Sequence, residues 1–216
     1  MTIPALASYP MPADPVENRV GWRLDPSRAA LLVHDMQAYF LNKFETTQAP
    51  VPALVQNIRQ LREACDDAGV PVFYTAQPVA QPAGDRALLN DFWGPGLTQA
   101  QFHAQQPIIE PLAPRAQDTV LTKWRYSAFQ RSDLREQLRA RGRDQLIICG
   151  IYAHIGCMAT ALEAFMQDVQ PFFVIDGVAD FSEEEHHMAV RYVARRCGMS
   201  VTVAQAVTAL AGESTR

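Results

Sequence analysis

The chain has 216 residues, of which 48% are hydrophobic and 19% are charged, and its formal net charge is -4. This composition is typical of one soluble globular domain and excludes a fibrous or a disordered protein. A mildly acidic charge without a run rich in lysine and arginine argues against nucleic acid or an anionic membrane surface as the main partner.

Residues 1–20 contain four prolines and lack a basic region followed by an apolar core, so they are not a secretory signal. No apolar run approaches the ~18 residues that a membrane span requires. The four cysteines lack CxxC spacing, which favours reduced thiols in the cytoplasm. We interpret residues 1–20 as an N-terminal arm and residues 21–216 as a single domain.

Short apolar runs alternate along the chain with longer segments of helical period, which indicates βα units around a parallel sheet. The expected strands are 29–34, 70–76, 119–122, 145–150, 172–176 and 200–204. The expected helices are 51–68, 132–141, 156–168 and 182–196, the second and fourth with Ser132 and Ser182 as N-caps. The pattern predicts an α/β fold: a doubly wound, Rossmann-like, three-layer sandwich with a mostly parallel six-stranded sheet. Residues 77–114 are less regular, which is typical of a lid or a binding loop.

Ligands of open α/β sheets bind beyond the carboxyl ends of the strands. Asp35 follows the first expected strand, Gln77 the second and Lys123 the third, while a glycine-flanked turn at 150–156 follows the fourth. We therefore expect an acid, an amide, a lysine and this turn to meet at one edge of the sheet.

Five segments together resemble isochorismatase, a family whose similarity covers nearly the whole chain, from about residue 3 to past residue 203. These segments are HDMQ at 34–37, YTAQP at 74–78, DFWGPG at 91–96, KWRYSAF at 123–129 and GIYAHIG at 150–156. The resemblance implies hydrolysis of the enolpyruvyl vinyl ether of isochorismate to 2,3-dihydro-2,3-dihydroxybenzoate and pyruvate, a step toward catechol siderophores. It implies no cofactor, and it implies association as a homodimer.

The wider superfamily contains cysteine hydrolases such as nicotinamidases, which use an Asp, Lys, Cys triad. In their pattern the nucleophile stands six residues after a glycine and a threonine stands ten after it. Counting from Gly150 places Gly156 where the nucleophile belongs, with Cys157 one residue beyond and Thr160 at the threonine. One residue on a helix is a rotation of about 100°, so we expect Cys157 to point elsewhere, as a small buried apolar residue.

A vinyl ether has no acyl carbon for a thiolate to attack, and what it needs is a proton on its methylene carbon. Asp35 is the candidate general acid. That role requires a pKa above the usual value of ~3.9, and we expect burial and the substrate's carboxylates to raise it. We expect Lys123 to be directed toward a substrate carboxylate rather than toward Asp35, and Gly156 to leave room for the substrate.

The other candidate residues follow from the charge of a dianionic substrate. Arg86 and Lys123 are the cations, Gln77 donates an amide hydrogen, and backbone N–H groups at 152–156 hold a carboxylate oxygen at a helix start. Aromatic walls are expected from Phe40, Trp93, Tyr126 and Tyr152.

Histidines are not expected to take part in the chemistry. His34 should face the opposite side of the sheet from Asp35, His154 suits a helix-capping or interface role, and His186 and His187 should lie on an exposed helix. They are scattered and form no set with metal-ligand spacing, so no metal site is expected, and the glycines form no nucleotide-binding fingerprint.

Three alternatives remain open. The first is the phenazine-pathway hydrolase of 2-amino-2-deoxyisochorismate, the second a cysteine amidohydrolase that uses Cys157, and the third a non-catalytic docking module. Residues 207–216 are too short for an aryl carrier domain, so a carrier protein would be a separate partner.

Overall fold

The computed structural model describes residues 3–212, and at its centre lies a six-stranded sheet in the order β3-β2-β1-β4-β5-β6. All five neighbouring pairs are parallel. The strands are β1 (Ala29–His34), β2 (Val72–Ala76), β3 (Thr119–Thr122), β4 (Gln145–Ile151), β5 (Gln170–Ala179) and β6 (Met199–Val201). This order is that of a doubly wound fold, so the predicted Rossmann-like α/β sandwich is confirmed.

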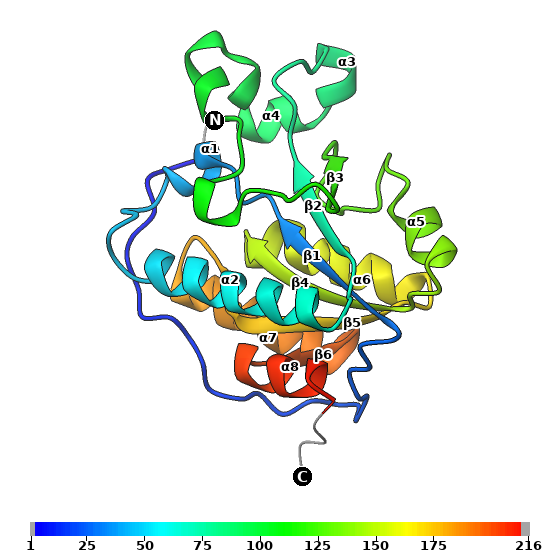
Figure 1. Cartoon of the computed structure of the whole chain (residues 1–216). Helices are drawn as coiled ribbons and strands as arrows, with labels where there is room; N and C mark the ends of the chain where they lie inside the picture. The colour runs from blue at the N-terminus through cyan, green and yellow to red at the C-terminus, as the bar shows by residue number, and fades with distance from the viewer. Residues whose placement is uncertain (1–2, 213–216) are drawn as a thin grey trace.

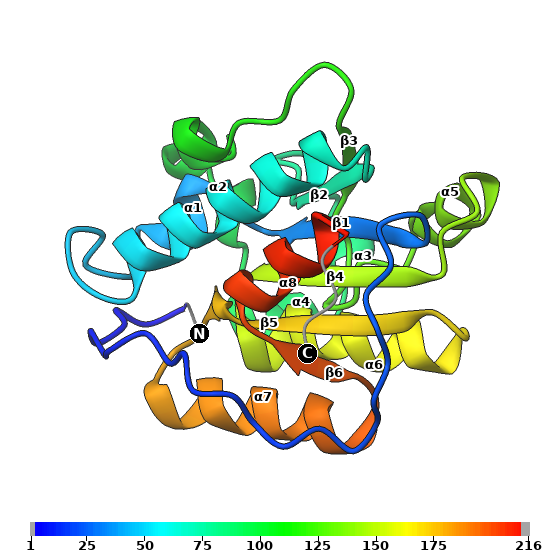
Figure 2. The ribbon, with the colours of Figure 1, turned by 60° about the horizontal axis from the view of Figure 1, so that its bottom comes forward.

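Helices cover both faces of the sheet (Figures 1 and 2). One face packs against α2 (Val51–Asp67) and α8 (Val203–Leu210), and the other against α5 (Leu134–Ala140), α6 (Met158–Met166) and α7 (Glu183–Arg196). A hydrophobic core lies on each face of the sheet. Successive residues of a strand point into the two cores in turn, because side chains alternate across a strand. All six positions of β1 are buried, as expected where helices shield a parallel sheet on both sides.

Several element boundaries differ from the sequence-based expectation, and the N-cap of α5 is Asp133 rather than the expected Ser132. The strand expected at 200–204 ends at Val201, because Thr202 and Gln205 form a capping box that starts α8. The helix expected from residue 156 begins at Met158, after a π-helical turn, η4 (Ala153–Cys157). Ser182 caps α7 as predicted, since its hydroxyl accepts a hydrogen bond from the Glu185 N–H.

The segment 77–114 lies above the carboxyl ends of the strands (Figure 1). It consists of short helical turns, which are α3 (Ala83–Arg86), α4 (Leu89–Trp93), η1 (Gly96–Thr98), η2 (Ala100–Gln105) and η3 (Glu110–Leu112). Residues 3–20 start beside the end of α1 (Ala38–Leu41) and then run along α7 toward β6. No helix within residues 3–212 has the length and apolar character needed to cross a membrane.

The chain leaves β1 toward β2 on one side of the sheet and leaves β4 toward β5 on the other. Since β1 and β4 are neighbours, their two connections diverge and leave a crevice beyond their carboxyl ends. This topological switch point is where the fold places a ligand.

Candidate functional site

One pocket at the switch point gathers the nine residues that the sequence proposes for catalysis and substrate binding. The nine are Asp35, Phe40, Gln77, Arg86, Trp93, Lys123, Tyr126, Tyr152 and Gly156. They come from the ends of β1, β2, β3 and β4 and from segment 77–114. The expected meeting of Asp35, Gln77, Lys123 and the turn at 150–156 at one edge of the sheet is therefore confirmed. Their roles remain a prediction.

A buried ion pair occupies the base of the pocket. The Lys123 Nζ atom donates a hydrogen bond to Asp35 Oδ2 at 2.8 Å, and the Thr75 hydroxyl donates to Asp35 Oδ1 at 2.6 Å. The Asp35 N–H donates in turn to the Thr75 hydroxyl oxygen. Asp35 has a φ of 49°, a left-handed conformation that non-glycine residues adopt only when their surroundings impose it.

The expected direction of Lys123 and the expected pKa of Asp35 are therefore wrong for the free protein. Burial raises the pKa of Asp35, but the Lys123 ammonium, His34 and the Thr75 hydroxyl together hold it below its usual range. Lys123 turns to Asp35 because a buried ammonium is costly unless a carboxylate lies beside it. Asp35 is ionised before a substrate arrives.

His34 fills the space beside Gly156. Its Nδ1 atom donates to the Ile151 carbonyl at 2.9 Å and lies 3.6 Å from Asp35 Oδ2. A Cβ atom on Gly156 would lie only 2.1 Å from the His34 ring. The missing side chain therefore makes room for this imidazole. Gly156 also lines the pocket, and the expectation that it leaves room for the substrate stays a prediction. Burial and nearby Lys123 lower the pKa of His34 to about 4, so the ring is neutral.

The expectation for Cys157 is confirmed. Its side chain is fully buried in the core between the sheet and α5, α6 and α7, and it does not line the pocket. Burial raises the pKa of its thiol far above the usual value, which opposes thiolate formation.

Uncompensated positive charge surrounds the ion pair. The Arg86 guanidinium is buried and donates to the Gly94 carbonyl at 2.7 Å and to Gln81 at 3.3 Å, while no carboxylate among the described residues pairs with it. Arg125, which sequence reasoning missed although it lies within a family segment, also lines the pocket and donates only to carbonyl oxygens. Three cations and one carboxylate give the pocket lining a net charge of +2.

Aromatic rings form one wall of the pocket. The Trp93 indole N–H donates to the Tyr126 hydroxyl at 2.8 Å, and the Tyr152 hydroxyl donates to the Phe40 carbonyl. Phe181, which no sequence signal marked, packs edge-on against Tyr152 and Trp93, with ring centroids 4.8 Å and 6.1 Å away.

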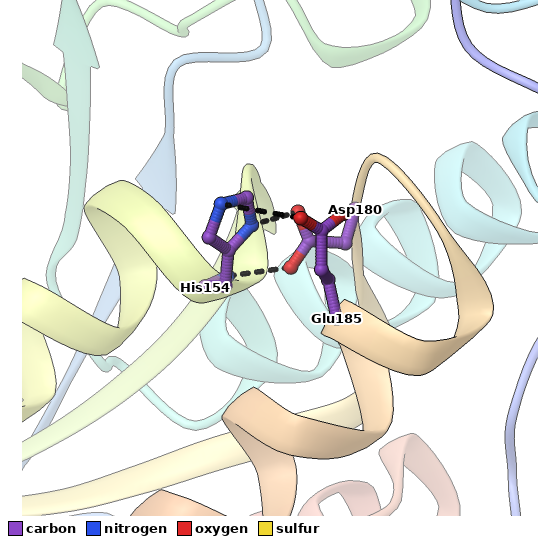
Figure 3. Close-up of side chains that lie close together, drawn as sticks. All are labelled: His154, Asp180 and Glu185. Carbon is purple, nitrogen blue, oxygen red and sulfur yellow. Dashed lines mark hydrogen bonds and ion pairs between the residues drawn. The ribbon is translucent and has the colours of Figure 1, made fainter.

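The helix start at 152–156 does not offer all of its N–H groups to a ligand. Asp180 accepts hydrogen bonds from the His154 N–H at 2.6 Å and from the His154 ring at 2.5 Å, and Glu185 lies 3.9 Å from that ring (Figure 3). At the His154 N–H, the carboxylate that was expected from a substrate is therefore that of Asp180. Burial lowers the pKa of His154, but the Asp180 hydrogen bond and the negative charges of Asp180 and Glu185 together outweigh it, so the net pKa is raised.

These three side chains are close enough to hold a cation. However, both Asp180 oxygens already accept N–H groups, from His154 and from Phe181, which fits a polar cluster that fixes the turn.

The expectation that His186 is exposed is also wrong. It is completely buried rather than exposed, because it lies on the face of α7 that meets the sheet, and it bonds to the Tyr9 hydroxyl and the Ile175 carbonyl.

Comparison with known proteins gives consistent results. The family model described as isochorismatase domain matches residues 29–205. The chain is 56% identical over 203 residues to the isochorismatase of Bacillus subtilis, covering 93% of this chain but 64% of that protein, slightly under two thirds of its length. It is 48% identical to phenazine biosynthesis protein PhzD1 of Pseudomonas aeruginosa, over 93% of this chain and 96% of that protein.

Among solved structures, a cysteine hydrolase from Pseudomonas syringae is similar, with a TM-score of 0.80 and 26% identity. The similarity covers 89% of this chain and 97% of that chain.

Replacing Gly156 by alanine is expected to destabilise the fold by about 1–3 kcal/mol, because the added methyl group must displace the His34 ring. Denaturant unfolding measures this loss. Gly21→Ala is the control, since nothing lies within 4 Å of a Cβ there. In a His34→Ser, Gly156→Ala double variant the losses should be less than additive, and strict additivity would show that the two residues do not oppose each other.

Proposed function

Because this chain belongs to the isochorismatase family, we propose that it hydrolyses the enolpyruvyl ether of isochorismate to 2,3-dihydro-2,3-dihydroxybenzoate and pyruvate. The observation that carries the proposal is a pocket lining with a net charge of +2 around a single buried carboxylate. Isochorismate carries two carboxylates, so its charge matches, and Asp35 is the group placed to supply a proton to carbon.

Binding of the dianionic substrate favours protonation of Asp35, which is ionised in the free protein. Arg86 has a planar fork suited to one substrate carboxylate, and its pKa is lowered by burial, a cost that an incoming anion relieves. The second carboxylate competes with Asp35 for Lys123, which lies 2.8 Å away from Asp35. As the Lys123 ammonium is shared with the substrate, the pKa of Asp35 rises and the carboxylate takes up a proton.

The chemical step then needs only a proton and a water molecule. The Asp35 carboxyl transfers its proton to the methylene carbon, which leaves an oxocarbenium ion and the Asp35 carboxylate. Water adds to this ion and releases one proton to solvent, from which Asp35 is later reprotonated. The hemiketal then passes its hydroxyl proton to the ether oxygen as the C–O bond breaks, which gives pyruvate and the ring alcohol. The aromatic wall around Trp93 and Tyr152 excludes other water from the cation.

The amino analogue of isochorismate is the second candidate substrate, because PhzD1 is a relative. Its ammonium group would need an anionic partner. Asp35 is the only acid among the described residues that line the pocket, and Lys123 already pairs with it. The charge distribution therefore favours the hydroxyl substrate.

The remaining alternatives find less support. An amidohydrolase would need the thiol of Cys157 in the pocket, whereas that thiol is buried in the core. A docking module has no use for a buried Asp35 and Lys123 pair. We propose in addition that the protein is a homodimer and that it is cytoplasmic, since its four free, buried cysteines suit a reducing compartment.

Pyruvate release from isochorismate and from its amino analogue, measured side by side, tests the proposal. We expect a higher kcat/KM for isochorismate.

Asp35→Asn should lower kcat by about 100-fold or more while substrate binding is kept or tightened, because the catalytic proton is lost and Lys123 is freed. Cys157→Ala should keep nearly full activity. Full kcat in Asp35→Asn, or inactivation by Cys157→Ala without unfolding, would overturn the mechanism.

Arg86→Gln should raise KM by about 10- to 100-fold with a smaller effect on kcat, since a charged hydrogen bond to the substrate is lost. Arg59→Gln is the matched control, because Arg59 is exposed on α2 and pairs only with Glu63. An equal KM in the two variants would show that Arg86 does not bind a carboxylate.

A further inference from the structure

The N-terminal arm reaches the pocket. Ile3 lines the same pocket as Asp35 and packs against the core between the sheet and α2. Three residues later, the Leu6 N–H donates to the Lys43 carbonyl at 2.7 Å, and Leu6 forms a β-bridge with Phe44. Leu6 is buried, so this contact holds the start of the arm against the end of α1, beside the pocket.

Tyr9 provides a second anchor for the arm, through hydrogen bonds to His186 and Asp180 whose donors and acceptors can be assigned. His186 donates from Nε2 to the Ile175 carbonyl at 2.9 Å, so its Nδ1 atom is an acceptor. The Tyr9 hydroxyl donates to this Nδ1 at 3.0 Å and accepts the Asp180 N–H at 2.7 Å. Tyr9 is 7% exposed, and its hydroxyl satisfies two groups that are themselves completely buried.

The second anchor is connected to the aromatic wall. Asp180 accepts a hydrogen bond from His154 (Figure 3). It also accepts one from the Phe181 N–H at 2.8 Å, and the His154 ring lies edge-on to the Phe181 ring. Phe181 in turn packs on Tyr152 and Trp93. A continuous set of contacts therefore runs from Tyr9 through Asp180 to the pocket.

We propose that residues 3–9 form part of the substrate-binding wall, with Ile3 contacting the apolar ring of the bound substrate and Tyr9 acting as a positioning residue for Phe181. The arm then contributes to affinity for the substrate and not to proton transfer, because Ile3 has no ionisable group and the Tyr9 hydroxyl bonds to His186 and Asp180. The inference rests on the proposed function for its kinetic assay alone.

Ile3→Ala tests the direct contact. Its KM for isochorismate should rise about five-fold, from lost apolar burial, with kcat within about two-fold of the original. Val16→Ala is the matched control, since Val16 is a partly buried aliphatic residue of the same arm that packs on the opposite core. Equal KM values in the two variants would remove Ile3 from the binding wall.

Tyr9→Phe tests the positioning role, because it keeps the ring and removes only the hydroxyl. We expect KM to rise with little change in kcat, and the amides of Asp180 and Phe181 to exchange their hydrogens faster. Tyr192→Phe, at an exposed position on α7, is the control and should change neither quantity. A Tyr9→Phe protein that unfolds more easily but keeps the original KM and exchange rates would show that Tyr9 serves stability alone.

The two proposals fail in different ways. Absence of pyruvate release from isochorismate in the unmodified protein would refute the proposed function, and the exchange rates at Asp180 and Phe181 would still decide whether Tyr9 positions the wall. An unchanged KM for isochorismate in both Ile3→Ala and Tyr9→Phe would refute the role of the arm alone.

Discussion

The ion pair between Asp35 and Lys123 is the interaction on which the site depends. Both side chains are almost completely buried and lie 2.8 Å apart at the end of β1. Charges buried in this way are costly unless they are paired, so each fixes the ionised state of the other. In the proposed mechanism this pair keeps Asp35 ionised in the free protein, and Asp35 becomes an acid only when another anion draws Lys123 away. Recognition of an anionic substrate and protonation of Asp35 are then one event.

A second buried carboxylate organises the wall of the pocket as the first organises its base. Asp180 follows β5, is completely buried, and accepts hydrogen bonds from both the backbone and the ring of His154. These contacts fix the turn that carries Gly156, which can approach His34 closely because it has no side chain. Residues from β4, β5 and the N-terminal arm therefore help to set the geometry around Asp35, although we propose a proton-donating role for Asp35 alone.

The sequence was sufficient for the sheet, because long apolar runs and helical periods depend on local burial, and for the meeting of Asp35, Gln77 and Lys123, because strand ends share one edge. The sequence was not sufficient to predict where side chains beyond the strand ends point. Alternation assigns His34 to a face, but its contact with Gly156 depends on how β4 and η4 leave the sheet. Ile3 and Phe181 carry no motif, so their place in the pocket is visible only from contacts between distant parts of the chain.

The most direct test of this account compares the pH dependence of kcat/KM, which reports the free enzyme, with that of kcat, which reports the complex. Asp35 must be protonated to act, and its pKa in the free protein is below the usual range, so kcat/KM should fall as the pH rises above that pKa. In the complex the substrate's carboxylates raise the same pKa. We expect the fall in kcat to lie at least about one pH unit higher. A fall at the same pH in both profiles would contradict the coupling between substrate binding and protonation of Asp35.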